Sequence, residues 1–333
     1  MTTTQTQGTK QLGALDRMQP VLLLGAIGIG LVLAELAPDF ASQLGWLVSA
    51  GVFAVIYLSM LGVRERNILK AFHQRRPTII ALGLNFVFTP ILAWSLGWLF
   101  LRDHPEIWVG LILYLVTPCI GWYLVFTDLA DGDVELGVSL LFWNILLQIL
   151  LIPLYLWLLA GQVVAVDVVI ILRSVGLFLV LPYALALGTR RILAAGNGTG
   201  VDLAERLPLG PLKTAALMLV VAAMFASQGG VLLDNPGVVV LMIGPGAAFF
   251  FLIFIVALTV SRMANLTYPE TALVTFTTAA RNSEVSLAVA ATAFASPLIA
   301  LTVVIGPAIE LPVLIVMLNI LKWLRTRWNF GRS

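Results

Sequence analysis

The sequence predicts an all-α membrane protein with ten transmembrane helices, and three observations support this fold class. Hydrophobic residues make up 60% of the 333 residues and charged residues only 11%. The mean hydropathy is +1.01. Soluble domains carry about 45–50% apolar and about 25% charged residues, so this chain has too few polar side chains to cover a water-facing surface. Long stretches without a single Asp, Glu, Lys or Arg recur along the chain.

The expected helices follow from these stretches, because crossing the hydrocarbon takes about 20 apolar residues whose backbone groups are satisfied within one helix. The charge-free stretches are Phe40–Val63, Pro77–Leu101, Ile107–Phe126, Leu136–Val166, Thr214–Leu233, Asn235–Ser261 and Val285–Ile309. Stretches with one or two ionisable residues inside or at an edge are Met18–Ala37, Val166–Thr189 and Leu298–Leu321. The ninth helix should end, and the tenth begin, near Ser296–Pro297.

The distribution of basic residues predicts the orientation, since cytoplasmic loops are enriched in Lys and Arg. Most of the 19 basic residues fall on one side if the N-terminus is inside, so we expect both termini to be cytoplasmic in a multi-pass protein of the cell membrane. The expected organisation is a disordered cytoplasmic segment (1–17), a five-helix repeat (18–163), a second five-helix repeat (164–325) and a cytoplasmic tail (326–333).

Two of the expected helices contain features that a continuous membrane helix avoids. Pro118 lies near the middle of the fourth, where proline removes a backbone donor and clashes with the preceding turn. The ninth contains the polar run Thr277–Glu284. One interrupted helix in each half predicts an inverted repeat whose broken helices meet at a site near the midplane. The alternative is that the proline is merely tolerated, as other prolines inside expected helices must be.

The ionisable residues within these helices are candidates for function, because a charge in the bilayer costs from about 3 to more than 10 kcal/mol. Glu310 lies between Pro307 and Pro312 with no basic residue near it in sequence, so it is a candidate proton carrier. Glu284 is a second candidate for proton coupling. Arg281 and Glu284 are three residues apart and could instead neutralise each other. Glu310 could also be a structural partner of Arg281.

Cys119 directly follows the interruption at Pro118, where a thiol would face the opened site. A soft sulfur ligand suits a thiophilic solute. The alternative is a small buried hydrophobic residue, which is the usual role of an unpaired cysteine. Asn85 and Asn144 are polar residues in apolar helices, and such residues more often form hydrogen bonds between helices than bind ligands.

These motifs resemble the arsenite efflux permeases of the bile-acid/sodium-symporter superfamily, over a span from about Pro20 to Arg325. The stretches that carry the likeness are Leu84–Pro90, Thr117–Cys119, Gly132–Val134, Phe276–Glu284 and Val304–Val313. The resemblance implies panel and core domains, with the fourth and ninth helices crossing in the core. It also implies that Cys119 and Glu310 are functionally required. We expect the substrate site to comprise Cys119, Asn85, Trp122, Asn144, Arg281 and Asn282.

The chain departs from this pattern in the ninth helix. Sodium-coupled relatives have Glu-Val-Gly-x-Gln-Asn where this chain has Thr277–Asn282, and a fixed guanidinium there would repel sodium. Proton coupling is therefore expected. The arsenite branch commonly has Asn-Asn-Phe-Glu where this chain reads Arg281–Glu284, so Arg281 could hold an anion instead.

Three functions remain open from the sequence. The first is proton-coupled efflux of arsenite or a related trivalent metalloid by alternating access, and the second is proton- or sodium-coupled transport of a small organic anion held by Arg281. A membrane-embedded enzyme or receptor is the third, although His73 and His104 both fall in loops and no nucleotide-binding motif is present. We expect no enzymatic activity, cofactor, bound metal or nucleic-acid partner. The expected partners are the solute, protons and the lipid bilayer, and a monomer would be sufficient.

Overall fold

The computed structural model consists of α-helices and short π-helical turns, without a β-strand among the residues that it describes. These residues are 14–61, 74–119, 122–163, 169, 172–173, 176–196, 209–234, 236–294 and 296–328. The all-helical fold class is thereby confirmed. Most of the expected disordered N-terminal segment and the last residues of the expected tail lie outside the described part of the chain.

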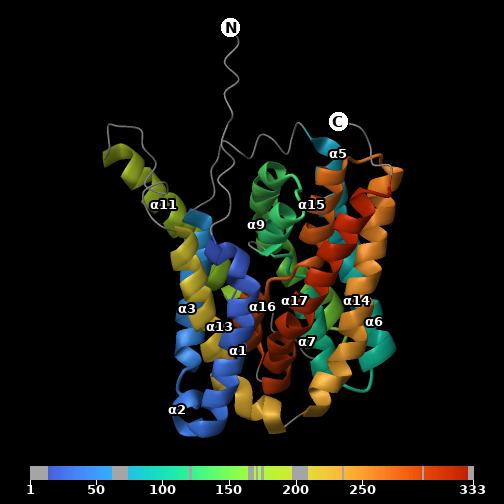
Figure 1. Cartoon of the computed structure of the whole chain (residues 1–333). Helices are drawn as coiled ribbons and strands as arrows, with labels where there is room; N and C mark the ends of the chain where they lie inside the picture. Colours follow the sequence, from blue (N-terminus) through green and yellow to red (C-terminus); the bar gives the residue numbers. More distant parts are fainter. Residues whose placement is uncertain are drawn as a thin grey trace.

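Helices follow one another along the first half of the chain (Figure 1). The first group is α1 (Ala14–Leu36), α2 (Pro38–Ser42), α3 (Gly45–Leu61), α5 (Arg75–Gly83), the π-helical turn η2 (Leu84–Phe88) and α6 (Thr89–Leu101). They are followed by α7 (Pro105–Leu115), α8 (Trp122–Leu129), α9 (Val134–Tyr155) and the π-helical turn η3 (Leu156–Ala160). Helix α1 begins at Ala14, four residues before the boundary expected at residue 18.

The second half of the chain contains the remaining elements. They are η4 (Gly176–Val180), α11 (Leu181–Gly196), α13 (Leu209–Asp234), α14 (Pro236–Met263), α15 (Tyr268–Ala279), α16 (Ser283–Ala293) and α17 (Pro297–Arg325). The expected boundary near Ser296–Pro297 is correct, because Ser296 caps the start of α17 by accepting a hydrogen bond from the Leu298 backbone.

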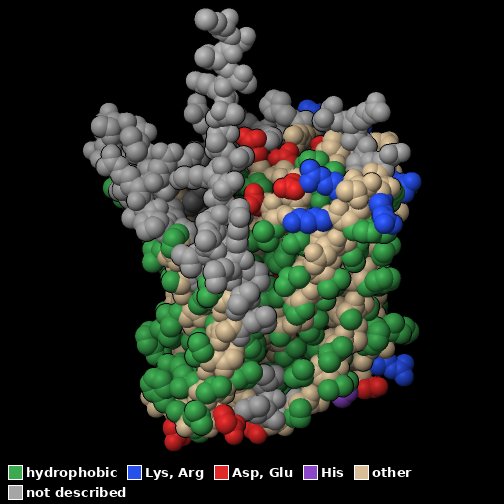
Figure 2. All heavy atoms as spheres, in the orientation of Figure 1, with side chains coloured by type: hydrophobic (Ala, Val, Ile, Leu, Met, Phe, Trp, Pro, Cys, Tyr) green, Lys and Arg blue, Asp and Glu red, His purple; other side chains and the backbone are tan. Residues whose placement is uncertain are grey.

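Among the described residues, the continuous helices Arg75–Leu101, Val134–Ala160, Pro236–Met263 and Pro297–Arg325 are long and apolar enough to cross a membrane. Large hydrophobic side chains such as Val87, Ile91, Phe251 and Ile255 are exposed on them. Figure 2 shows a broad hydrophobic band with charged side chains gathered at its two ends. An exposed apolar surface of this kind is what lipid would cover. The chain is thus a multi-pass membrane protein, and the count of ten helices stays a prediction.

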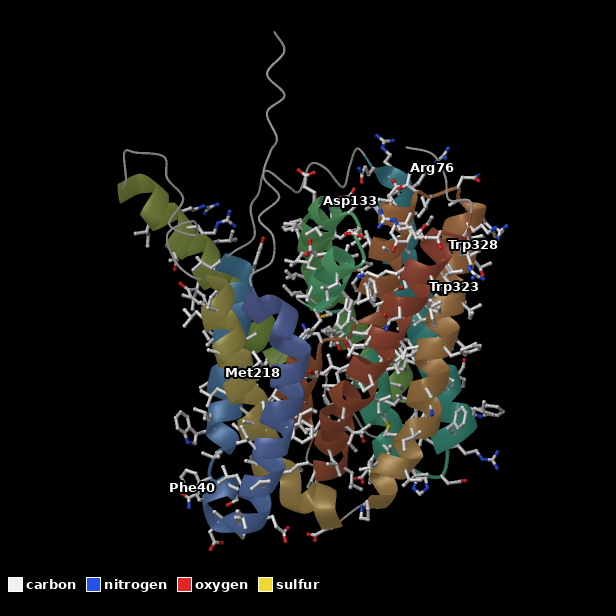
Figure 3. All side chains as sticks on the ribbon, viewed as in Figure 1. Phe40, Arg76, Asp133, Met218, Trp323 and Trp328 are labelled. Atoms are coloured by element: carbon white, nitrogen blue, oxygen red, sulfur yellow. The ribbon has the colours of Figure 1, made fainter. Side chains whose placement is uncertain are left out.

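The ends of the molecule can be followed in Figure 3, where Arg76, Asp133 and Trp328 lie at one end and Phe40 at the other. Asp133 caps the N-terminus of α9, because its carboxylate accepts a hydrogen bond of 2.9 Å from the Leu136 backbone. Its own backbone N–H donates to the carbonyl oxygen of Pro269 in α15, at 3.0 Å. This loop therefore links the first half of the chain to the second at the end where Asp133 lies.

The helices pack in two groups. Helices α1, α3, α11 and α13 form the smaller group, in which α1 and α3 both pack against α13 and α11 packs against α3 (Figure 1). The larger group contains α5 to α9 and α14 to α17, with α7 and α14 both packed against α17. Contacts between the groups include those of α13 with α17 and of α16 with α3.

Helices α7 and α17 approach each other closely at two glycines. A Cβ atom on Gly110 of α7 would lie 2.6 Å from the Thr302 Cβ, and one on Gly306 of α17 would overlap the ring of Tyr114. Any larger residue at either position would force the helices apart. The glycines therefore permit the tight contact that brings Tyr114 next to α17.

Both expected interruptions are present. Helix α7 ends at Leu115 and α8 begins at Trp122, while α15 ends at Ala279 and α16 begins at Ser283. Proline alone does not cause such a break here, because α9, α14 and α17 continue through Pro153, Pro245, Pro307 and Pro312. Neighbouring helices can satisfy the backbone groups that a proline frees in a membrane helix.

Candidate functional site

The two interruptions pair with each other through their backbones. Pro118 and Arg281 form an isolated antiparallel bridge. On either side of it, the Cys119 backbone N–H donates to the Ala280 carbonyl oxygen at 3.0 Å, and the Asn282 N–H donates to the Thr117 carbonyl oxygen at 2.8 Å. The broken helices therefore cross at a point where extended backbone replaces helix. We call the residues 117–119 and 280–282 the crossing.

The residue after the bridge caps the next helix in each half. The Cys119 sulfur accepts a hydrogen bond from the Trp122 backbone N–H at 3.1 Å, and the Asn282 Oδ1 accepts one from the Val285 N–H at 3.1 Å. Each acceptor thus bonds a backbone donor three residues later, as an N-capping side chain does. The crossing consequently presents the partly positive N-termini of both α8 and α16.

Arg281 is the one buried cation among the described residues, with a relative exposure of 1%. Its guanidinium bonds to carbonyl oxygens at the ends of both first half-helices: Nη1 donates to Leu115 at 2.8 Å, and Nε to Ala279 at 3.2 Å. Nη2 donates to the Thr278 carbonyl oxygen and, at 3.0 Å, to the Asn85 Oδ1. The carbon at the centre of the guanidinium lies 5.3 Å from the centre of the Phe249 ring.

These contacts bear on two interpretations of Arg281 offered by the sequence. A guanidinium has five N–H donors, and four hydrogen bonds to protein oxygens already engage this one. A bidentate clamp on a carboxylate would need two free donors, which are not available in this state. Arg281 also precedes α16 instead of lying on it, and the Glu284 side chain lies outside the part of the chain that the structure describes.

Glu310 of α17 faces the crossing and is buried, with a relative exposure of 3%. Its Oε1 accepts a hydrogen bond of 3.1 Å from the Arg281 backbone N–H, and its Oε2 accepts one from the Tyr114 hydroxyl. The expected link between Glu310 and Arg281 is therefore present, although it runs through the Arg281 backbone. Tyr114 was not a candidate from the sequence, because aromatic residues are common in apolar helices and 196 positions separate it from Glu310.

The asparagines expected in the site join α15 to other helices. Asn85 lies in the π-helical turn η2 and donates to the Thr277 carbonyl oxygen at 3.1 Å while accepting from Arg281. Asn144 of α9 donates to the Thr277 hydroxyl at 3.3 Å. Gln148, one turn further along α9, donates to the Pro118 carbonyl oxygen at 2.5 Å. All three side chains therefore form hydrogen bonds between elements that are distant in the sequence.

Two buried polar atoms, Asn144 Oδ1 and Asn282 Nδ2, have no hydrogen-bond partner among the residues that the structure describes. Both side chains are about 1% exposed. A buried polar group without a partner costs about 1–3 kcal/mol, so native proteins rarely leave one without a functional reason. An amide oxygen and an amide nitrogen are thus available for a small polar solute.

The structure brings together most of the residues expected in the site. Pro118, Cys119, Arg281 and Asn282 form the crossing, and Asn85, Asn144 and Glu310 contact it or the adjoining end of α15. Cys119 is buried and, as the one cysteine in the sequence, forms no disulfide within the chain. Trp122 begins α8 and is buried, with its backbone N–H on the Cys119 sulfur.

Polar residues that the sequence did not single out also hold the crossing. The hydroxyls of Thr117 and Ser286 lie 2.5 Å apart, and the Ser286 hydroxyl is also within hydrogen-bonding distance of the carbonyl oxygens of Leu113 and Asn282. No cluster of His, Cys, Asp and Glu that could bind a metal ion occurs among the described residues. The chemistry that the crossing offers is therefore one thiol, a carboxylate, several amides and hydroxyls, and a fixed guanidinium.

The profile of the sodium bile acid symporter family matches residues 49–235, which is more than half of the chain and includes Pro118 and Cys119. Arg281 and Glu310 lie beyond the matched segment.

Curated relatives extend the likeness to nearly the whole chain. The arsenical-resistance protein Acr3 of Corynebacterium glutamicum is 28% identical, over 94% of this chain and 90% of its own length. Acr3 of Alkaliphilus metalliredigens is 24% identical, over 96% and 95%. A relative named only as an uncharacterized transporter, from a Synechocystis strain, is 26% identical over 96% and 92%.

Proposed function

The chain belongs to the sodium bile acid symporter family, and we propose that it is a secondary active transporter which exports arsenite or a related trivalent metalloid in exchange for protons. The observation that carries this proposal is the crossing, where Cys119 is paired with Ala280 and the Glu310 carboxylate with the Arg281 backbone. Names of two relatives as arsenical-resistance proteins support the choice of solute. The family name and the name of the Synechocystis relative support transport instead of enzymatic activity.

An inverted repeat of two five-helix units is part of the proposal, with the units at 18–163 and 164–325. Pro118 and Arg281 lie 163 positions apart, and the same shift moves α7 (Pro105–Leu115) to 268–278, where α15 is found. It moves Val134–Ala160 to 297–323, which lies within α17. Ten helices in panel and core domains, with the fourth and ninth crossing, would follow from this correspondence. The smaller helix group would be the panel and the larger group the core.

The Cys119 thiol is the proposed ligand of the metalloid. A soft sulfur suits a thiophilic element. Asn144 Oδ1 and Asn282 Nδ2 would receive the hydroxyl groups of the bound solute, with Trp122 and Asn85 lining the site. A single thiol with neutral hydrogen-bonding neighbours binds less permanently than a multi-thiol site, and a carrier must also release its solute.

Glu310 is the proposed proton carrier, because its carboxylate is buried at the crossing and hydrogen-bonded to Tyr114. Alternate protonation of Glu310 would favour states open to opposite sides, as the core moves against the panel. Glu284 remains a second proposed proton site. The proposed setting is the cell membrane, with both termini in the cytoplasm and one chain sufficient for transport.

An organic-anion carrier is the weaker alternative. It requires Arg281 to bind a carboxylate, yet four hydrogen bonds already tie its guanidinium to the protein. Uptake of labelled carboxylates by vesicles containing the chain, compared with an Arg281→Ala variant, would restore this alternative if it detected saturable flux that depends on Arg281.

The proposal is tested by expressing the chain in a metalloid-sensitive host and measuring arsenite flux into everted vesicles under an imposed proton gradient. The parent chain should confer resistance and show proton-dependent arsenite flux. In Cys119→Ser and in Glu310→Gln the flux should fall at least about tenfold, a loss typical of removing one group around a bound ion. Glu106→Gln, a carboxyl change outside the crossing, should behave like the parent. The double change Cys119→Ser/Ser42→Cys moves the thiol to an exposed position and should not restore flux. Resistance unaffected by Cys119→Ser would exclude the proposed ligand.

A further inference from the structure

The carbonyl oxygens around Arg281 are those that the interruptions leave without helical partners. In a continuous helix the Leu115 oxygen would accept from the N–H of Cys119, and the Thr278 oxygen from that of Asn282. Those two N–H groups instead bond across the crossing, to Ala280 and Thr117. The end of each first half-helix is therefore left with an orphan carbonyl directed toward the interior of the protein.

One side chain satisfies the orphan carbonyls of both halves. Leu115 and Thr278 are 163 positions apart, the same spacing that relates Pro118 to Arg281, so they are equivalent carbonyls of the two interrupted helices. The Arg281 guanidinium bonds to both of them, to Ala279 and to the Asn85 Oδ1. These four oxygens come from α7, α15 and η2, and we call them the oxygen cage.

The electrostatics of the oxygen cage require a positive charge. Each helix C-terminus carries a partial negative charge of roughly half an electron, and two of them meet here away from water. All four ligands in the cage are neutral oxygens, which attract a cation without discharging it. The Phe249 ring lies 5.3 Å from the guanidinium carbon, and an aromatic face also favours a cation. Removing the charge would leave buried carbonyls with neither donor nor counter-charge.

We propose that Arg281 is a built-in cation of the crossing, and that its oxygen cage becomes a binding site for a free guanidinium ion when the side chain is removed. The first half of the chain has proline at the equivalent position, so it supplies no charge of its own. A single arginine therefore serves both half-helices. A covalently attached cation cannot dissociate, so the crossing is held together at any external concentration of monovalent cations.

Chemical rescue of an Arg281→Ala variant tests this inference through thermal unfolding of the purified chain in detergent. The unfolding midpoint of Arg281→Ala should fall by about 5 °C or more, since several buried carbonyls lose their donors. Adding guanidinium chloride at about 10 mM, roughly a hundredfold below denaturing concentrations, should recover at least about half of that loss. The parent chain should show no gain under the same conditions.

Matched controls separate rescue from general salt effects. Choline chloride at the same ionic strength should not stabilise Arg281→Ala, because its bulky trimethylammonium group has no N–H donors for the four carbonyl and amide oxygens of the cage. Arg102→Ala removes an arginine whose side chain is 67% exposed and should show neither the loss nor the rescue. Equal stabilisation by choline and guanidinium, or no response of Arg281→Ala to guanidinium, would overturn the proposal.

A second pair of variants keeps the test decisive if Arg281→Ala cannot be purified. Arg281→Lys retains a charge, whereas Arg281→Gln retains polar donors without one. The lysine variant should unfold at a higher temperature than the glutamine variant, and the reverse order would overturn the proposal. Neither experiment involves transport, so a failure here leaves the proposed solute untouched, and a failure of arsenite flux leaves the built-in cation untouched.

Discussion

The two interrupted helices have the same backbone arrangement but contribute different chemistry. In α7–α8 the bridging residue is Pro118, which has no N–H, and the capping residue is Cys119 with a soft sulfur. In α15–α16 the bridging residue is Arg281 with a fixed charge, and the capping residue is Asn282 with an amide. Two interruptions with similar backbone hydrogen bonds can therefore carry side chains with different roles. The first interruption supplies the proposed metalloid ligand, and the second supplies the charge that stabilises both.

Exchanging the caps is the strongest way to break this comparison. In Cys119→Asn/Asn282→Cys both positions keep a side chain able to accept a hydrogen bond, but the thiol moves to the other half. Arsenite flux should fall by about 100-fold, the upper end of the loss seen when a ligand shell is disturbed. Vesicle flux measures this, and the unfolding midpoint shows whether the fold is retained. Flux near the parent value would mean that the two halves are interchangeable.

Restoring a donor at the first interruption should have the next largest effect. Pro118→Ala supplies a backbone N–H that can bond to the Tyr114 carbonyl oxygen, which now accepts from the Thr117 hydroxyl at 2.9 Å. Helix α7 could then extend through the crossing, and transport should fall about tenfold even though helix formation becomes easier. Circular dichroism together with flux measures both quantities. An unchanged flux would show that the crossing does not depend on proline.

Removing the amide cap tests the second interruption through stability. Asn282→Ala loses the acceptor for the Val285 N–H, and the free energy of unfolding should fall by about 1 kcal/mol, as for other lost N-caps. Cys119→Ala should lose less, because sulfur is a weak acceptor. Denaturant unfolding of both variants gives the comparison. A larger loss for Cys119→Ala would reverse the assignment of structural and ligand roles.

The smallest expected effect concerns the hydroxyl on Glu310. Tyr114→Phe removes a donor to the carboxylate but keeps the ring that packs against Gly306. Transport should persist within about threefold, because the carboxylate keeps its hydrogen bond from the Arg281 backbone N–H. Vesicle flux under the same proton gradient checks this. A loss of about tenfold or more would mean that the Tyr114 hydroxyl is itself required for transport.

The sequence could predict the apolar helices and the two interruptions, because both depend on local composition. Charge-free stretches fix where a helix can cross lipid, and the polar run Thr277–Glu284 cannot lie in an unbroken apolar helix. It could not predict which prolines interrupt a helix. Pro307 and Pro312 lie within the continuous helix α17, whereas Pro118 lies at a break, and the difference depends on tertiary partners.

The partners of the charged residues were also beyond local inference. From sequence, Arg281 had three candidate partners: Glu284, Glu310 and a bound anion. In the structure its guanidinium donates to carbonyl oxygens of α15, the helix that precedes it, and of α7, and the contact with Leu115 spans 166 positions. The contact between Tyr114 and Glu310 depends on Gly306, whose missing side chain makes room for the aromatic ring. Neither arrangement leaves a periodic signal in the sequence.

The close packing of α7 on α17 at Gly110 and Gly306 also limits how the molecule can move. Closely packed side chains resist sliding, so we expect α7 and α17, with the Glu310 carboxylate between them, to move as one rigid unit. In the proposed transport cycle, relative movement is then expected at less extensive interfaces, such as that between α16 and α3. A larger residue at position 110 would displace both helices of this unit.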